Sequence, residues 1–256
     1  MRPMFRPLLL TIALVSSTLL AGCAVPPPAD DPDAIAEFKE NNDPLEPTNR
    51  FFYQVNDALD TLLLKPVATV YRGVVPQPVR TGVHNVLNHL ATPVVLANDI
   101  LQGDKQRAGA TISRFIVNTT MGLGGLYDMA SDLAIPMHDA DFGMTLAVWG
   151  VPDGAFLFLP VLGPSNPRDA IGFAVDTFAL DPWGWVGRGT AVHDLRLART
   201  GVSAVDARTA YLDEFDKVKA QALDPYATVR SLTRQYRAAR IGEAKRDEIG
   251  AVKKSP

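Results

Sequence analysis

Four histidines are the side chains of this sequence best suited to metal binding or acid–base catalysis, at positions His84, His89, His138 and His193. His84 and His89 are five residues apart, whereas two ligands on one helix face need a spacing of four, as in the HExxH motif. A catalytic triad assembles in space and so is not recognisable from scattered residues. The spacing of the histidines therefore does not predict a metal site.

Two glycine-containing segments resemble fragments of known motifs, and both are incomplete. Residues 163–167 (GPSNP) lack the second glycine of a hydrolase nucleophile elbow. Gly122-Leu123-Gly124 lacks the final glycine of a dinucleotide-binding fingerprint and has no strand–helix–strand pattern around it. No phosphate-binding P-loop is present. We therefore expect a protein that is not an enzyme and needs no cofactor.

The single cysteine, Cys23, excludes an intramolecular disulfide and a cysteine-based zinc site. It directly follows Leu20-Ala21-Gly22, at the end of an apolar run over residues 8–20 that is too short to span a membrane. Arg2 and Arg6 precede the run, as in a secretory signal peptide. The pattern resembles the bacterial lipobox, in which the cysteine is diacylated. The alternative is an ordinary signal peptide with a chance cysteine.

Lipidation at Cys23 changes the expected relation of the chain to the membrane. Each buried CH₂ contributes about 0.8 kcal/mol, so two or more acyl chains hold a protein firmly. Ala24 follows the cysteine. By resemblance to Gram-negative lipoproteins, the absence of Asp there favours the outer membrane. We expect a lipid-anchored protein that faces the periplasm.

The composition is that of an ordinary globular chain with a mildly apolar character. The chain has 256 residues, of which 47% are hydrophobic and 21% charged, so wholesale disorder is excluded. Its pI near 5.8 argues against a nucleic-acid binder. Its mean hydropathy is +0.04. Loss of residues 1–22, which carry Arg2 and Arg6, leaves 23 basic and 28 acidic residues, a net charge of −5.

The elements that would position any functional residue are predicted to be helices. Residues 24–47 are rich in proline and acid and predict a semi-extended tether, with one or two helical turns over 33–40 as the alternative. Apolar residues at steps of three and four then predict amphipathic helices. These lie near 46–63, 66–73, 78–101, 104–119 and 167–236 in several pieces.

Individual residues are expected to begin or end these helices. Thr48 and Asp104 are suited to N-caps. Pro93 should end or kink its helix, and Gly103 should stop it. The last helix should start at Pro225.

The segment 143–163 (GMTLAVWGVPDGAFLFLPVLG) is strongly apolar but interrupted. Its centre, Val151-Pro152-Asp153-Gly154, has turn residues, and the apolar runs on either side predict a hairpin. Short apolar runs are ambiguous. Two interpretations stay open, a buried core hairpin and an apolar surface that faces lipid.

Four blocks of the sequence resemble the MlaA (VacJ) lipoprotein family over residues 42–236. The first is Asp43-Pro44-Leu45-Glu46 followed by Asn49-Arg50. The second runs from Lys65 to Arg80, the third from Asn118 to Asp128 with Gly122, Gly124 and Gly125, and the fourth from Asp141 to Asp169. Asp224-Pro225-Tyr226 also matches.

The resemblance implies an all-α protein, a ring-like arrangement of amphipathic helices with an apolar hairpin, embedded in the membrane interface. It implies a channel that removes mislocalised phospholipid from the outer leaflet and passes it to the periplasmic carrier MlaC. Trimeric porins are the implied outer-membrane partners. The expected regions are a signal peptide (1–22), a lipidated flexible tether (23–42), the helical domain (43–236) and a charged, flexible tail (237–256).

Several residues are expected to serve the channel. The predicted hairpin would edge or gate it, through Gly143, Gly150, Pro152, Gly154, Pro160 and Gly163. Gly122, Gly124 and Gly125 would let backbones pack closely beside it. Arg50, Arg72, Arg80 and Arg168 would bind lipid phosphate or form structural ion pairs.

Two other functions are weighed against lipid transfer. One is a structural or surface-interaction lipoprotein without a lipid conduit, which would contain no bound phospholipid. The other is a lipid hydrolase, whose activity would depend on a single Ser or His.

Overall fold

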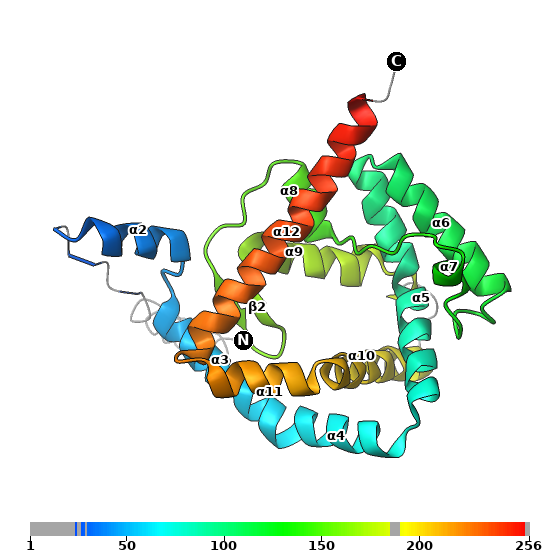
Figure 1. Cartoon of the computed structure of the whole chain (residues 1–256), viewed down its shortest axis with the longest axis horizontal. Helices are drawn as coiled ribbons and strands as arrows, with labels where there is room; N and C mark the ends of the chain where they lie inside the picture. The colour runs from blue at the N-terminus through cyan, green and yellow to red at the C-terminus, as the bar shows by residue number, and fades with distance from the viewer. Residues whose placement is uncertain (1–23, 25–26, 29, 185–189, 254–256) are drawn as a thin grey trace, which may run out of the picture.

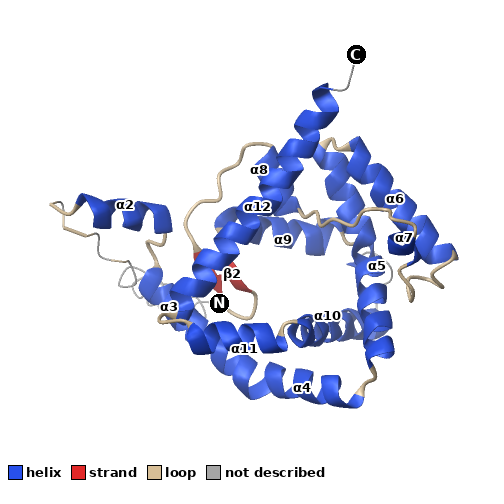
Figure 2. Ribbon diagram, in the orientation of Figure 1, coloured by secondary structure: helices blue, strands red, loops and turns tan. Residues whose placement is uncertain are grey.

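The computed structural model of the chain describes residues 24, 27–28, 30–184 and 190–253 (Figure 1). The predicted signal peptide and Cys23 lie outside the described residues. The described part is built from helices, joined to a single two-stranded sheet (Figure 2). The expected all-α class is therefore confirmed.

The first half of the described chain is a succession of helices. They are α2 (Pro32–Asn41), α3 (Glu46–Leu59), the π-helix η1 (Asp60–Leu64), α4 (Lys65–Val74), α5 (Gln77–Gln102), α6 (Lys105–Thr120) and α7 (Met129–Asp132). The side chain of Asp104 caps α6 by accepting from the backbone N–H groups of Gln106 and Arg107, as predicted. Gly103, at φ +77°, ends α5. Helix α3 begins two residues before the predicted cap, Thr48.

The second half contains the hairpin. Its elements are α8 (Phe142–Val148), β1 (Leu157–Leu159), β2 (Gly163–Ser165), α9 (Pro167–Val175), the π-helix η2 (Asp176–Leu180), the 3₁₀ turn η3 (Pro182–Gly184), α10 (Thr190–Ala210), α11 (Leu212–Gln221) and α12 (Pro225–Lys253). The strands pair antiparallel, with Leu157 opposite Ser165 and Leu159 opposite Gly163.

The helices are arranged as a ring, as expected (Figure 1). Helix α3 and η1 lead into α4, α4 packs on α10, and α10 packs on α5. Helix α5 also packs on α8, which crosses α9 and α12. The ring closes where the hairpin, joined to α9, packs through β1 against α3.

Helix α5 continues through Pro93, so of the two predicted effects, an end or a kink, the end is wrong. Proline removes the hydrogen bond to the carbonyl one turn earlier and disturbs its neighbours. Here the adjacent Leu90 carbonyl accepts from the Trp183 indole N–H at 3.1 Å and from the Arg199 guanidinium at 3.5 Å. Donors from η3 and α10 therefore support the perturbed turn of α5.

Both terminal regions contain helix. Helix α2 lies within the predicted tether, where helical turns over 33–40 were the alternative expectation. Helix α12 runs to Lys253, so no boundary of an element occurs at residue 236. Arg237 and Arg240 of the predicted flexible tail pair with Asp141 and Asp139. These ion pairs and the buried Ala244 hold residues 237–244 against the body.

Candidate functional site

The described part of the chain reverses the usual distribution of polar and apolar side chains. Thirteen buried residues are polar or charged and only ten are hydrophobic. Many large hydrophobic side chains are exposed, among them a stripe along α3, η1 and α4: Leu59, Leu63, Val67, Val70 and Val74. Exposed apolar patches of this kind mark surfaces for lipid or for partners.

An apolar groove lies between α5 and α10, with a volume of about 880 Å³. Its walls carry the valines and leucines Val79, Val83, Val86, Leu87, Leu90, Leu126, Leu195 and Val202. Gln77, Thr81, Asn85 and Arg199 add polar groups. Arg199 is held by Asp181, with 2.9 Å between Nη1 and the carboxylate. The groove thus combines room for hydrocarbon with a few polar positions, as ligand sites do.

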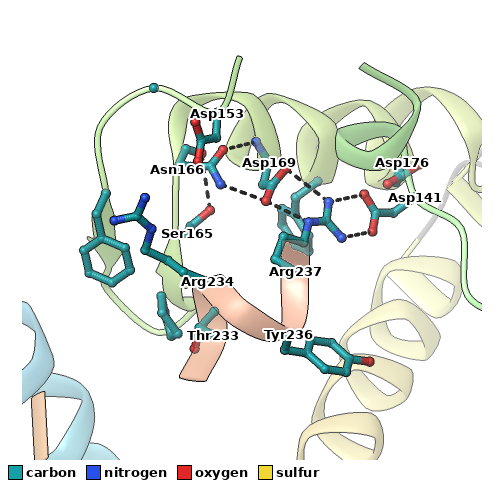
Figure 3. Close-up of a pocket in the computed structure, with 14 residues that line it drawn as sticks. Asp141, Asp153, Ser165, Asn166, Asp169, Asp176, Thr233, Arg234, Tyr236 and Arg237 are labelled. Carbon is teal, nitrogen blue, oxygen red and sulfur yellow. Dashed lines mark hydrogen bonds and ion pairs between the residues drawn. The ribbon is translucent and has the colours of Figure 1, made fainter. Parts of the chain in front are cut away.

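A second, polar cavity of about 360 Å³ lies between α9, α12 and the hairpin (Figure 3). Arg237 of α12 spans it and binds two carboxylates at once, Asp141 at 2.5 and 2.6 Å and Asp169 at 2.9 and 3.1 Å. Burial alone would raise the pKa of Asp169, but Arg237 and Arg168 lower it below its usual value. These charge-assisted bonds fix α12 across the ends of α8 and α9.

The crossing of α8 and α9 beside this cavity depends on two glycines. A Cβ on Gly172 would lie 2.3 Å from the backbone nitrogen of Gly143. A Cβ on Gly143 would meet Asp169 at 2.6 Å and Arg237 at 2.7 Å. Gly143, one of the predicted hairpin residues, is therefore required for a helix crossing.

The family motif at Asp43 and Asn49 forms a buried hydrogen-bonded cluster. Asp43, 3% exposed, accepts from Asn49 at 2.7 Å, from the Arg230 guanidinium at 2.8 Å and from the Tyr226 hydroxyl. Burial and the neighbouring Asp43 carboxylate both raise the pKa of Tyr226. The motif thus connects the start of α3 with the first turns of α12.

The other residues of the motif complete this connection. Pro44 and Leu45 lead into α3, and Leu45 occupies its N-cap position. Arg50 pairs with Glu46 at 2.7 Å and with Asp224 at 2.6 Å, and its guanidinium lies 4.5 Å from the centre of the Tyr226 ring. Asp224 is the residue before Pro225, where α12 begins. The matched blocks at 43–50 and 224–226 are therefore contact partners.

The arginines proposed for lipid phosphate all have partners in the protein. Arg50 pairs as described, Arg72 with Asp213 at 3.0 Å and Arg168 with Asp169 at 3.0 Å. Arg80 donates to the Val75 carbonyl at 3.1 Å. Of the two roles expected from the sequence, structural ion pairing is therefore observed for three of the four arginines.

The predicted hairpin differs from the observed one in position. Residues 142–148 form helix α8, capped by the Asp141 side chain, and the strands lie at 157–159 and 163–165. The hairpin therefore turns at Pro160, Val161 and Leu162, and not at Pro152. Short apolar runs suit either structure, and the Asp141 cap favours helix in the first of them.

Three predicted gate glycines have positive φ, but they lie in different elements. Gly150 (φ +92°) ends α8, Gly154 (φ +76°) lies in the loop before β1, and Gly163 (φ +83°) starts β2. Gly150 therefore shapes the end of α8, and proline, with a φ near −65°, could not adopt its conformation.

The glycine segment after α6 packs closely at two of its three positions. A Cβ on Gly122 would lie 2.2 Å from the Tyr127 carbonyl, and one on Gly125 would lie 2.5 Å from the Cβ of His89. Gly124 has φ +71° and open space around it. The loop returns to Asp128, which accepts from Arg114 at 2.7 Å and from Asn118 at 3.0 Å.

A buried polar cluster joins α5, α6 and α8, and the sequence analysis did not identify it. Asp99, fully buried, accepts from Thr111 at 2.6 Å and contacts His138 at 2.8 Å. Thr145 donates to Asn98 at 2.8 Å and accepts from Gln102 at 3.0 Å. The available signal was the pair Asn98-Asp99 inside an otherwise apolar helical run.

The three histidines whose side chains the structure describes lie at different places. His84 contacts Asp206 at 2.7 Å, His89 stacks on Phe115, and His138 lies in the buried cluster. No group of three metal-ligating side chains occurs among the described residues. Nor does any helix in the described ranges have the length and apolar character needed to cross a bilayer.

Comparison with known proteins gives one consistent relationship. The sequence model of the MlaA lipoprotein family matches residues 41–240. The intermembrane phospholipid transport system lipoprotein MlaA of Haemophilus influenzae is 34% identical, over 91% of this chain and 90% of its own length. The Escherichia coli protein of the same name is 32% identical, over 86% and 84%.

A solved structure has the same fold. It comes from work on the structural basis for maintenance of bacterial outer membrane lipid asymmetry. Its TM-score is 0.67 at 30% sequence identity, and the match covers 78% of this chain and 98% of the solved one. The chain described here therefore belongs to the MlaA lipoprotein family.

Proposed function

We propose that this protein is an outer-membrane lipoprotein that removes mislocalised phospholipid from the outer leaflet and so maintains lipid asymmetry. The observation that carries the proposal is the ring of helices with apolar side chains on exposed faces and charged side chains buried, in a member of the MlaA family. A transporter of amphipathic lipid needs apolar surface for acyl chains and polar groups for headgroups.

The proposed path uses the two sites of the ring. The groove between α5 and α10, at about 880 Å³, takes acyl chains against its valines and leucines. Helix α5 links this groove to the polar cavity, because Asn98 in its second half donates to Asp176 at 2.8 Å. Transfer is a movement between these environments without covalent chemistry, so the protein acts as a carrier and not as an enzyme.

Acyl chains on Cys23 hold the protein at the periplasmic face of the outer membrane in this proposal. The exposed stripe on η1 and α4 lies against lipid or a trimeric porin. A periplasmic carrier of the MlaC type receives the phospholipid. The proposed position is at the membrane interface, where amphipathic helices bury one face.

Deletion of the gene tests the proposal. We expect more phospholipid in the outer leaflet, measured in intact cells with a membrane-impermeant, amine-reactive label. Full-length protein should restore the normal level. A Cys23→Ala protein should not restore it at equal abundance. An unchanged outer leaflet in the deletion strain would contradict the function.

A further inference from the structure

The polar cavity between α9 and α12 has more carboxylates than guanidinium groups. It is lined by Asp141, Asp153, Asp169 and Asp176 and by two arginines, Arg234 and Arg237. Arg237 alone is shared by Asp141 and Asp169 (Figure 3). Asp169 also pairs with Arg168 at 3.0 Å, so three guanidinium groups, counting Arg234, stand against four carboxylates. The excess negative charge makes the cavity attractive to a cation.

The two other carboxylates, Asp153 and Asp176, form no ion pair within the described ranges, although the charge of Arg237 acts to lower the pKa of Asp176. Asp176 accepts from the Asn98 amide at 2.8 Å and from the Phe142 backbone N–H at 2.9 Å, both neutral donors. Burial is the largest influence on Asp176 and raises its pKa. Asp153 lies in the loop before β1 and has no hydrogen bond or ion pair to the part of the chain that the structure describes. A cation bound beside Asp153 would stabilise its unpaired negative charge.

Three aromatic residues form another part of the cavity wall. Phe156, Phe173 and Tyr236 line it together with the charged groups. Phe173 and Tyr236 are more than half exposed, so their ring faces are accessible. Aromatic faces attract ammonium groups through their quadrupole. Carboxylates combined with aromatic rings favour an organic ammonium over a small, strongly hydrated metal ion.

The opposite side of the same wall is basic. A groove of about 730 Å³ along α12 shares Asp153, Asn166, Arg234 and Arg237 with the cavity. Its other charged residues are Arg168, Arg230 and Lys245. Arg234 donates to the Asn41 carbonyl and points away from Arg237 (Figure 3). Negative and positive sites therefore adjoin across Asp153 and Arg234.

We propose that this cavity and groove together bind the headgroup of a zwitterionic phospholipid, with the amine at Asp153 and the phosphate at Arg234, two residues that line both. The inference rests on the proposed transport function and names the preferred class of cargo. At about 360 Å³ the cavity is at the small end of ligand sites, which fits a headgroup and leaves the acyl chains outside it. An anionic glycerol headgroup would place no positive charge against Asp153.

A lipid-retention experiment tests this with the full-length lipoprotein. The protein is incubated in mixed detergent micelles with equal amounts of phosphatidylethanolamine and phosphatidylglycerol. After repurification, the retained phospholipid is identified by mass spectrometry. We expect about fivefold enrichment of phosphatidylethanolamine, equivalent to about 1 kcal/mol, the value of a partly solvated ion pair.

Single substitutions separate the two ends of the headgroup. Asp153→Asn, at a side chain without protein partners in the described ranges, should bring the ratio of the two lipids close to one. Arg234→Gln should lower the retained amount of both lipids, since both carry phosphate. Asp194→Asn, on the exposed surface of α10, is the matched control and should keep the fivefold ratio.

The outcomes distinguish this inference from the function on which it rests. Wild-type protein that retains both lipids equally would overturn the inference and leave phospholipid transport intact. An unchanged ratio in Asp153→Asn would also overturn it. Wild-type protein that retains no phospholipid would contradict both the inference and the proposed function.

Discussion

Asn49 and Asn56 lie seven residues apart on α3, and the side-chain amide of each both donates to and accepts from the backbone of the hairpin segment. Asn49 donates to the Phe156 carbonyl at 3.0 Å and accepts from the Phe158 N–H at 2.8 Å. Asn56 does the same with Leu159 at 2.9 Å and Val161 at 2.8 Å. Seven helical residues and three strand residues both span about 10 Å, so the two amides match the repeat of the strand.

Asn49→Ala should destabilise the protein strongly because its partners are buried. The substitution leaves the Phe158 N–H, the Phe156 carbonyl and one oxygen of Asp43 without their hydrogen bonds. We expect a loss of about 2–4 kcal/mol in the free energy of unfolding. Thermal unfolding in detergent would show a midpoint lower by about 5–15 °C.

Asn56→Ala is the matched control for this change. Its hydrogen bonds lie near the exposed end of the hairpin, where water replaces them, and the loss should be about 1 kcal/mol. Equal effects of the two substitutions would show that burial does not set the strength of the clamp.

Ionisation of Asp128 should make the free energy of unfolding depend on pH in the acidic range. Burial alone would raise its pKa, but hydrogen bonds from Ser131, Asn118 and Arg114 outweigh burial and lower the pKa to about 2. A pKa lower in the folded than in the unfolded state stabilises the protein above the unfolded value. That stabilisation is present above pH 4 and is lost as the pH falls toward 2.

The measurement compares wild type with Asp128→Asn in urea. Because Asp128 is partly exposed, we expect the substitution to cost about 1 kcal/mol at pH 7. The difference between the two proteins should shrink as the pH falls from 4 to 2. A difference independent of pH would mean that the ionised form of Asp128 is not what stabilises the loop.

Gly125→Ala should be more harmful than Gly124→Ala. Both residues have positive φ, which costs an L-residue about 1–2 kcal/mol. Only at Gly125 would the new Cβ also collide with the Cβ of His89, at 2.5 Å. Overpacking adds about 1–3 kcal/mol, so the unfolding midpoint of Gly125→Ala should be the lower by several degrees. Similar midpoints would mean that His89 moves away at little cost.

The sequence predicted the helices well where a local signal exists. Asp104 and Gly103 act within one turn of themselves, so their effects on α6 and α5 follow from residue type. Pro93 does not end its helix, contrary to one of its two predicted effects, because Trp183 and Arg199, about 90 and 106 residues later, donate to the perturbed turn. No local pattern contains that information.

The candidate site shows the same difference between local signals, which the sequence reveals, and contacts between distant segments, which it does not. The resemblance located the motif from Asp43 to Arg50, but its partners Tyr226 and Arg230 come from the other end of the chain. The hairpin was expected eight residues too early, because a Pro-Asp-Gly turn signal at 152–154 is stronger than Pro160-Val161-Leu162. Arg237 was assigned to a flexible tail because its carboxylate partners are distant in sequence.

Val161 at the hairpin tip is a strained residue whose side chain has no packing role. Its φ is +68°, an unfavourable conformation for a β-branched residue, and it is 80% exposed. Strain of this kind persists at functional positions. We expect Val161→Gly to raise the free energy of unfolding by about 1 kcal/mol, since glycine adopts positive φ freely.

The same change should slow removal of outer-leaflet phospholipid if the apolar tip contacts lipid. Val161→Leu, which keeps an apolar tip, should retain transport. A stabilised Val161→Gly protein with normal transport would show that the tip has no part in moving lipid.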